Sequence, residues 1–340
     1  MAFSQMNKMS VNDRPIEVAK NVFRIRIPVP FSVKYVNVYA IDSEGLSLVD
    51  AGPKTTEAFN ALSDGLGELG FSLRDVDRIV FTHRHVDHIG MGNTIKMMRN
   101  AETCIHESDV EAASNFYEEY DRFLESLKAP ILEAGVPRQF LDKMTGYYGI
   151  IRRVCEPVEI DRKLKDGDAL NIGNVKLEVI HCPGHSQGSI CLYEDERRLL
   201  FTGDHILKEI TPNPFASGLH QKASLKVYLN SLSKVEDLDV TVDLPGHGEI
   251  IHDHVSVIKD LFKHHETRKR VILEALNDGP KTPYEVCKAV FGSLPTSEAL
   301  LGLAEAGGHL EELLADNMVE LFKKDDLIYF KKTSQSRKLF

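Results

Sequence analysis

The sequence lacks the features that mark membrane and exported proteins. No apolar run reaches the length of a membrane-spanning helix, and the polar N-terminus carries no apolar segment of a signal peptide. Acidic residues also outnumber basic ones, 51 against 41, so the formal net charge is −10. Phosphate binding needs a local basic excess, so this balance argues against a surface that coats nucleic acid, although a local patch stays compatible with it.

Cysteine is sparse and forms no disulfide-like pattern. The chain has five cysteines, an odd number, and none belongs to a CxxC pair: Cys104, Cys155, Cys182, Cys191 and Cys287. Such a set suits a reducing compartment, and we therefore expect a cytoplasmic enzyme. Cys182 follows His181 at the end of an apolar run, and we interpret it as a small buried hydrophobe rather than a functional group.

What is present is an ordinary globular composition in a fairly long chain. The 340 residues are 42% hydrophobic and 27% charged, which is enough for one large domain and a small one. The residue pattern predicts a large domain over residues 1–263 and a small domain over residues 264–340. A helical insertion at about residues 108–153 interrupts the large domain.

Alternating and apolar runs predict two sets of strands. The first set covers residues 22–27, 33–41, 46–49, 78–81 and 103–105, and the second covers 169–172, 175–180, 189–193, 198–201 and 241–244. Helices are expected at residues 55–69, 92–99, 225–234 and from 254 beyond 262. The insertion carries aromatic residues that either pack as a satellite core or line a substrate site: Phe116, Tyr117, Tyr120, Phe123, Phe140, Tyr147 and Tyr148.

The C-terminal segment has the pattern of a winged helix. Three helices and a hairpin are expected at residues 268–277, from 282, at 299–316, and at 318–322 with 327–331. The second helix should have Thr282 as its N-terminal cap and Pro283 in its first turn. From Glu266 to Phe340 there are 11 Lys and Arg against 12 Asp and Glu. A helix that reads a DNA groove should be basic, so a DNA-binding regulator is disfavoured. We expect this unit to pack on the large domain or on a second subunit, which leaves a homodimer open.

The most informative segment places three histidines and an aspartate within six positions: His83, His85, Asp87 and His88. It follows the apolar residues 79–81. In an extended stretch His83 and His85 point to the same side. Asp87 and His88 then fall where the chain turns and can address a second site. So dense a group of polar side chains is unfavourable for folding unless something binds it, and two divalent metals would do so.

Three later segments each end a strand with a glycine turn and a metal-ligand residue. They deliver His185 after Gly184, Asp204 after Gly203, and His247 after Gly246. A glycine lets the backbone turn sharply and approach a metal without a side-chain clash. Neighbouring His181 and His205 are interpreted as strand or pocket-wall residues.

In these motifs and their order the chain resembles the metallo-β-lactamase superfamily, within it the glyoxalase II-like group and the β-lactamase-like protein 2 type. The resemblance implies an α/β fold, a four-layer αββα sandwich with two metals at one edge of its sheets. It assigns His83, His85 and His185 to one metal, Asp87, His88 and His247 to the other, and Asp204 to both. Asp50, in the motif Leu48-Val49-Asp50-Ala51-Gly52, would orient these ligands through hydrogen bonds.

The implied chemistry is hydrolysis by a hydroxide held between two metals. Metals roughly 3.5–4 Å apart lower the pKa of a shared water towards about 7, and Asp87 would orient the hydroxide and receive its proton. Zinc suits a histidine-rich site best, while the carboxylates also permit iron or manganese. The GxSxG pattern at Gly184–Gly188 is a chance match, because His185 already has a role as ligand.

The substrate is the open question at this stage. We favour a thioester or ester of a small acyl molecule, such as acyl-CoA or acyl-glutathione. The alternative is a hydrolase of single-stranded RNA or another phosphodiester. A lactonase ranks lower because Leu207 stands where lactonases have tyrosine, and the basic glutathione-binding motif of glyoxalase II is not visible.

Overall fold

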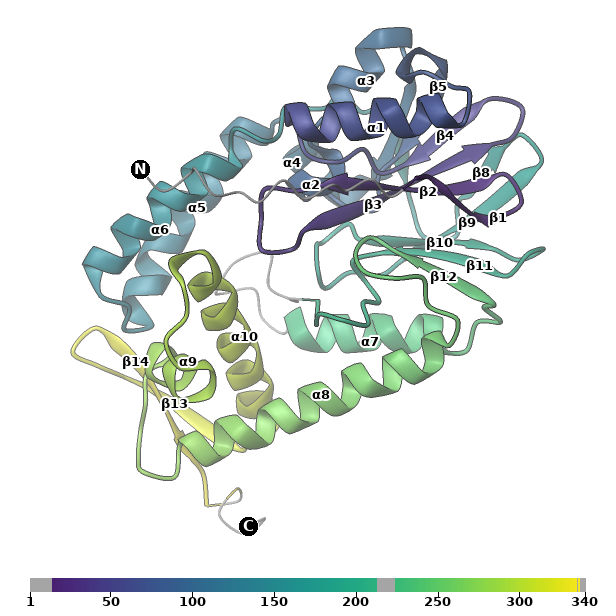
Figure 1. The fold of residues 1–340 in the computed structure, drawn as a ribbon. Helices are drawn as coiled ribbons and strands as arrows, with labels where there is room; N and C mark the ends of the chain where they lie inside the picture. The colour runs from purple at the N-terminus through teal and green to yellow at the C-terminus, as the bar shows by residue number, and fades with distance from the viewer. Residues whose placement is uncertain (1–13, 213–223, 335, 337–340) are drawn as a thin grey trace.

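Two β-sheets packed face to face, with helices on both outer sides, form the body of the molecule (Figure 1). The computed structural model describes residues 14–212, 224–334 and 336. Helix α1 (Thr56–Glu68) and α3 (Gly92–Arg99) cover one sheet, and α7 (Ser224–Glu236) and α8 (His254–Ala275) cover the other. The expected four-layer αββα sandwich is therefore confirmed.

The first sheet has seven strands in chain order, from β1 to β7. Pairing is antiparallel from β1 to β4 and parallel from β4 to β7. The strands are β1 (Ile16–Ala19), β2 (Val22–Pro28), β3 (Tyr35–Asp42), β4 (Leu46–Val49), β5 (Val76–Val80), β6 (Glu102–His106) and β7 (Arg162–Leu164). The sequence patterns did not predict β1 and β7, because strands of four and three residues are too short to show a clear alternation.

The second sheet has five strands in the order β12-β11-β10-β9-β8. Only the β11–β12 pair is parallel. The strands are β8 (Ala169–Ile172), β9 (Val175–His181), β10 (Ile190–Glu194), β11 (Leu199–Gly203) and β12 (Val242–Pro245). All five agree with the predicted runs to within two residues.

Apolar side chains fill the space between the layers in three clusters. Residues such as Ile41 and Val49 from the first sheet meet Leu177 and Phe201 from the second in the central cluster. A second cluster joins the first sheet to α1, whose first turn is capped by Thr55. A third joins the second sheet to α7 and α8. This packing leaves the strand ends at one edge free to carry polar residues.

The insertion consists of α4 (Val110–Ser114), α5 (Phe116–Glu133) and α6 (Arg138–Ile151). Its aromatic residues divide between two cores, since Phe116 packs with the first sheet while Phe123 and Phe140 pack with the C-terminal segment. The described aromatic side chains therefore act mainly as core residues. The side chains of Tyr147 and Tyr148 lie outside the described part.

The C-terminal segment is tied to the sandwich by one continuous helix. Helix α8 runs through the predicted boundary at residues 263 and 264, where the sequence patterns had predicted two separate helices. Packing of its buried face along the whole length keeps it continuous. The remaining elements are α9 (Pro283–Phe291), which has the predicted Thr282 cap, α10 (Thr296–Ala315), β13 (Val319–Lys324) and β14 (Leu327–Lys332). The domain division and the winged-helix assignment stay predictions.

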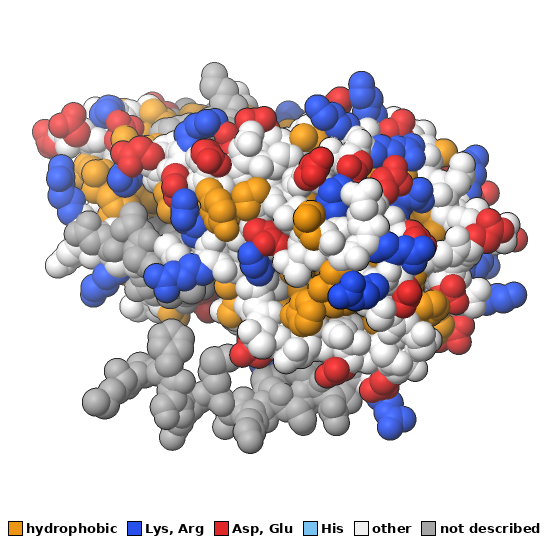
Figure 2. Space-filling model, turned by 90° about the horizontal axis from the view of Figure 1, so that it is seen from above, with side chains coloured by type: hydrophobic (Ala, Val, Ile, Leu, Met, Phe, Trp, Pro, Cys, Tyr) orange, Lys and Arg blue, Asp and Glu red, His pale blue; other side chains and the backbone are white. Residues whose placement is uncertain are grey.

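Two short 3-10 helices, at Leu73–Asp75 and Glu107–Asp109, and α2 (Val86–Ile89) complete the described elements. Among the described helices, none combines the length and apolar character required to cross a bilayer. Acidic and basic side chains are interspersed on the face that carries α1 (Figure 2). That face therefore offers no broad field of one charge.

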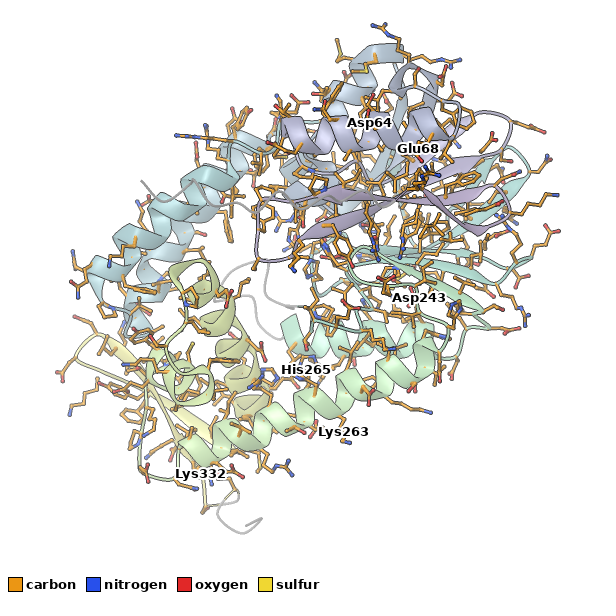
Figure 3. The ribbon with its side chains drawn as sticks, in the orientation of Figure 1. Asp64, Glu68, Asp243, Lys263, His265 and Lys332 are labelled. Carbon is orange, nitrogen blue, oxygen red and sulfur yellow. The ribbon has the colours of Figure 1, made fainter. Side chains whose placement is uncertain are left out.

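Two buried histidines join α8 to α10. His265, labelled in Figure 3, lies on the side of α8 that faces α10, and its Nδ1 is 3.1 Å from Nε2 of His309. Both side chains are at most 1% exposed. Burial, together with His309 and His264, lowers the pKa of His265 to about 3, and burial lowers the pKa of His309 to about 4.

This pair should make stability fall with pH below neutrality. The unfolded chain binds protons at these histidines near the ordinary pKa of about 6.5, whereas the folded chain resists protonation until about pH 4. Between these values stability should decline by up to about 1.4 kcal/mol per pH unit for each histidine. Urea unfolding of chelator-treated protein at pH 7 and pH 5 measures this loss. His309→Gln should reduce it, while exposed His252→Gln should leave it unchanged.

Candidate metal centre

All seven residues assigned to metals by the resemblance lie at one edge of the two sheets. Each follows the end of a strand: His83, His85, Asp87 and His88 follow β5, His185 follows β9, Asp204 follows β11, and His247 follows β12. Their side chains are buried or partly buried. Four segments that are distant in sequence therefore converge because their strands end at the same edge.

The side chains form two adjacent groups. One contains His83, His85, His185 and Asp204, and the other contains Asp87, His88 and His247. Within each group the candidate ligand atoms lie within 4.8 Å of one another. The resemblance implies the same division for the six residues other than Asp204, which it assigns to both groups, and binding of metal by these residues stays a proposal.

Asp204 connects the two groups. Its Oδ2 lies 3.3 Å from Nε2 of His185 and 3.5 Å from Nε2 of His247, and its Oδ1 lies 3.4 Å from Nε2 of His88. His83 is slightly farther away, at 4.0 Å. One carboxylate thus faces histidines of both groups, as a bridging ligand would.

Contacts on the far side of three rings turn their Nε2 atoms towards the centre. Nδ1 of His88 is 2.7 Å from Oδ2 of Asp50, and Nδ1 of His247 is 2.6 Å from the Tyr35 carbonyl oxygen. Nδ1 of His83 is 3.1 Å from the Thr82 hydroxyl. Partners of this kind hold the ring orientation and the tautomer of a metal-ligating histidine.

Asp50 occupies a backbone conformation that is unusual for a residue with a side chain. Its φ is +63°, in the left-handed region. The buried carboxylate accepts hydrogen bonds from the Thr82 amide at 2.8 Å and from the Thr82 hydroxyl at 2.8 Å, besides facing His88. The unfavourable backbone conformation of Asp50 is stabilised by these contacts, which join the end of β4 to the segment that carries His83 and His88.

Two atoms inside the cluster fit a cation better than a hydrogen bond. Nε2 of His88 and Oδ1 of Asp204 are buried, and neither has a hydrogen-bond partner among the described residues. Unpaired buried polar atoms are costly, so they need a partner of another kind. Imidazole nitrogens and carboxylate oxygens suit zinc, iron or manganese, and the donor set is therefore compatible with divalent metals.

Two glycines allow the strand ends to approach so closely. A Cβ atom on Gly246 would stand 2.5 Å from Oδ1 of Asp204 and 2.8 Å from Cε1 of His88. Gly203 has a φ of +48°, and a Cβ there would stand 2.6 Å from the Thr82 hydroxyl oxygen. A larger residue at position 246 would displace the candidate ligands Asp204 and His88, and one at position 203 would displace Thr82, which contacts Asp50 and His83.

The electrostatics of the cluster favour charged carboxylates. Burial raises the pKa of Asp87, but His88 and His247 outweigh this effect and lower it to about 2. For Asp204, burial is likewise outweighed by His247 and His88, and its pKa falls well below the usual range. Burial lowers the pKa of His83 and His85 well below 6.5, which keeps these rings neutral, whereas for His88 and His247 burial is outweighed by the carboxylates, Asp204 first, which raise the pKa.

Asp109 is an organising residue that the sequence patterns did not reveal. Its fully buried carboxylate accepts hydrogen bonds from the Arg84 amide at 3.1 Å, the Ser186 hydroxyl at 2.6 Å and the Gly188 amide at 3.0 Å. It thereby joins the segment of His83 and His85 to the turn of His185. Asp109 is 25 residues beyond Arg84 and belongs to no motif, so no spacing pattern in the sequence could have identified it.

Two further histidines, His181 and His205, lie next to the seven-residue centre in sequence. His181 ends β9 and stacks on His106 with 3.8 Å between ring centroids. His205 is buried directly after Asp204, on the side of the second sheet that faces α7. Neither belongs to the two candidate ligand groups.

Comparison with known proteins identifies the family. Residues 32–247 match the metallo-beta-lactamase superfamily. The chain belongs to this superfamily. It is a hydrolase of the superfamily with a His and Asp cluster that could hold divalent metal.

Two similar proteins cover most of the chain, and a third covers about half of it. A probable metallo-hydrolase of Bacillus subtilis is 29% identical, over 92% of this chain and 98% of its own length. A beta-lactamase-like protein 2 homolog of Caenorhabditis elegans is 28% identical, over 86% and 83%. An atrochrysone carboxyl ACP thioesterase of Aspergillus fumigatus is 26% identical, over 48% and 54%.

A solved structure agrees with these relatives. The crystal structure of a metallo-beta-lactamase family protein of Thermus thermophilus superposes with a TM-score of 0.81 at 29% identity. It covers 93% of this chain and 99% of the Thermus protein. The similarity includes the insertion and C-terminal segment as well as the sandwich, because less than a tenth of the chain lies outside it.

Substitution of Asp50 should weaken metal binding without removing a ligand. Asp50→Asn keeps the shape and tolerates the left-handed backbone, but it loses the negative charge that faces His88. We expect zinc affinity to fall by roughly 10- to 100-fold in a competition titration with a chromophoric chelator. Exposed Asp64→Asn is the control and should bind as the wild type does. Equal affinities of the two variants would contradict the role of Asp50.

Substitution of Asp109 should affect the fold and the site together. Asp109→Asn keeps the side-chain volume but replaces an acceptor oxygen by a donor group, which leaves one buried amide or hydroxyl unpaired. We expect a loss of about 1–3 kcal/mol in the free energy of unfolding of metal-free protein. Metal content after purification should also fall. Unchanged stability would show that the two turns are held by other contacts.

Proposed function

We propose that the chain is a metal-dependent hydrolase of thioesters or related esters with a small acyl group. The observation that carries this proposal is the convergence of six His and Asp side chains around Asp204, where buried atoms of His88 and Asp204 lack hydrogen-bond partners among the described residues. When bound, divalent cations supply a nucleophile that is ionised at neutral pH and stabilise the charge that develops on the substrate oxygen.

Asp87 is the residue proposed to manage the proton. Its Oδ2 is 3.3 Å from Nε2 of His247, so the partly buried carboxylate lies among the candidate ligands. An ionised carboxylate at this position can accept a hydrogen bond from the attacking water and take up its proton. His88, held by Asp50, fixes the segment from which Asp87 projects.

Two observations support a thioester over a nucleic acid as substrate. One relative is named as a carboxyl ACP thioesterase, and it matches about half of this chain. The face that carries α1 has mixed charges (Figure 2), and the C-terminal segment has a net charge of −1, so neither presents the basic field that a polyanion would require. An acyl group joined to a small thiol carrier places no such demand on the surface.

A panel of thioesters tests the proposal directly. Zinc-, iron- and manganese-loaded protein should release free thiol from acyl-CoA or acyl-glutathione compounds, and chelation should abolish the release. Asp87→Asn should lower kcat/KM by roughly 10²- to 10⁴-fold. Asp64→Asn, an exposed change on α1 (Figure 3), should retain full activity.

The same panel distinguishes the main alternative. If every metal-loaded form leaves the thioesters intact but cuts single-stranded RNA, and Asp87→Asn loses the cutting, the phosphodiesterase alternative replaces this proposal. Hydrolysis of thioesters that survives in Asp87→Asn would remove Asp87 from the proposed role.

A further inference from the structure

A second cluster of metal-ligand residues lies on the face of the second sheet that packs against α7, away from the first sheet. It consists of Cys182 after β9, Cys191 in β10 and His205 after β11. The candidate ligand atoms of the three residues lie within 4.8 Å of one another. The two cysteines are 0% exposed and the histidine is 1% exposed. We propose that this cluster binds a thiophilic divalent cation, zinc, at a site separate from the seven-residue centre.

The sheet geometry brings the two sulfurs together. The amide of Cys182 donates to the carbonyl of Ser189 at 2.8 Å, which places these two residues opposite each other in the antiparallel pair. Cys191 is two residues beyond Ser189 and therefore points to the same face of the sheet as Cys182. Both thiols are free, and they are close enough to hydrogen-bond to each other.

His205 provides an independent indication of a ligand. Neither of its buried ring nitrogens has a hydrogen-bond partner among the described residues, and the sulfurs of both Cys182 and Cys191 lie within 4.8 Å of its candidate ligand atom. The hydroxyl of Tyr228 donates to the His205 carbonyl at 3.0 Å and so is not available to the ring. An imidazole this deeply buried requires a partner, and a cation between the ring and the sulfurs would supply one.

The chemistry of the donors selects the cation. Thiolate and imidazole together suit zinc, with Zn–S distances of about 2.3 Å, and the three side chains would leave the fourth position of a tetrahedral zinc to a small ligand such as water. Two thiolates and one divalent cation have no net charge, which is the least costly state in a dry environment. The surroundings are apolar and include Ile206, Leu225 and Leu232. A monovalent cation would leave a buried negative charge.

The position of this site would connect it to the seven-residue centre. Cys182 precedes His185 by three residues, and His205 directly follows Asp204. A cation held by Cys182, Cys191 and His205 would therefore fasten together the two turns that present His185 and Asp204. We expect it to act as a structural clamp and to contact no substrate, because α7 covers it.

Cobalt substitution tests the site in the full-length protein. The seven-residue centre contains no sulfur, so thiolate-to-cobalt charge-transfer absorption in the near ultraviolet would report only on the cysteine cluster. We expect this absorption in cobalt-loaded wild type and its loss in Cys182→Ala and in Cys191→Ala. Each variant should also bind one equivalent of metal fewer than the wild type. Cys104→Ala, which changes a buried cysteine in the central core, should keep both properties.

A measurement on the wild type alone keeps the proposal testable if the variants fold poorly. X-ray absorption of zinc-loaded protein should show sulfur neighbours at about 2.3 Å from a fraction of the zinc. Absence of sulfur scattering when the histidine-rich centre is loaded would overturn the proposal. Charge-transfer absorption that persists in Cys182→Ala would overturn it as well, since the thiolate ligand would then lie elsewhere.

Discussion

The carboxylate of Asp204 lies buried within 4.0 Å of four histidine rings, and much of the structure serves to keep it there. A buried negative charge is stable only where cations or hydrogen-bond donors surround it. The two sheets satisfy this requirement by ending their strands at a common edge. Glycines at the turns allow the approach, and Asp50 and Asp109 hold the turns from outside.

Rigid packing behind the edge explains how seven polar side chains keep their positions. Three apolar clusters join the four layers, so each strand that delivers a ligand is fixed on both faces. The insertion and the C-terminal segment share a further core, to which α5 contributes Leu127 and Ile131 and α10 contributes Leu303 and Leu310. The continuous helix α8 packs against the second sheet with its first half and contributes to this outer core with its second half. It therefore holds the C-terminal segment against the sandwich.

Polar residues buried in pairs recur at the joints between these layers. His265 and His309 join α8 to α10, and Asp243 on β12 accepts a hydrogen bond from Thr202 on β11 at 2.6 Å. Burial raises the pKa of Asp243 well above the usual range, which favours the neutral acid. Such pairs add little to stability compared with apolar packing, but they define one register between neighbouring elements.

The sequence by itself determined the ligand types, their order and the strands that deliver them, because metal ligation and strand alternation are local patterns. These patterns predicted most of the strands and the Thr282 cap, while the αββα sandwich and the assignment of the seven residues came from the resemblance of the motifs to a known superfamily. Only the tertiary structure decided which distant residues meet. Asp109 reaches Ser186 across 77 positions, Cys182 and Cys191 face His205, and α8 continues where two helices were expected. These contacts follow from packing between layers, and packing leaves no periodic signal in the chain.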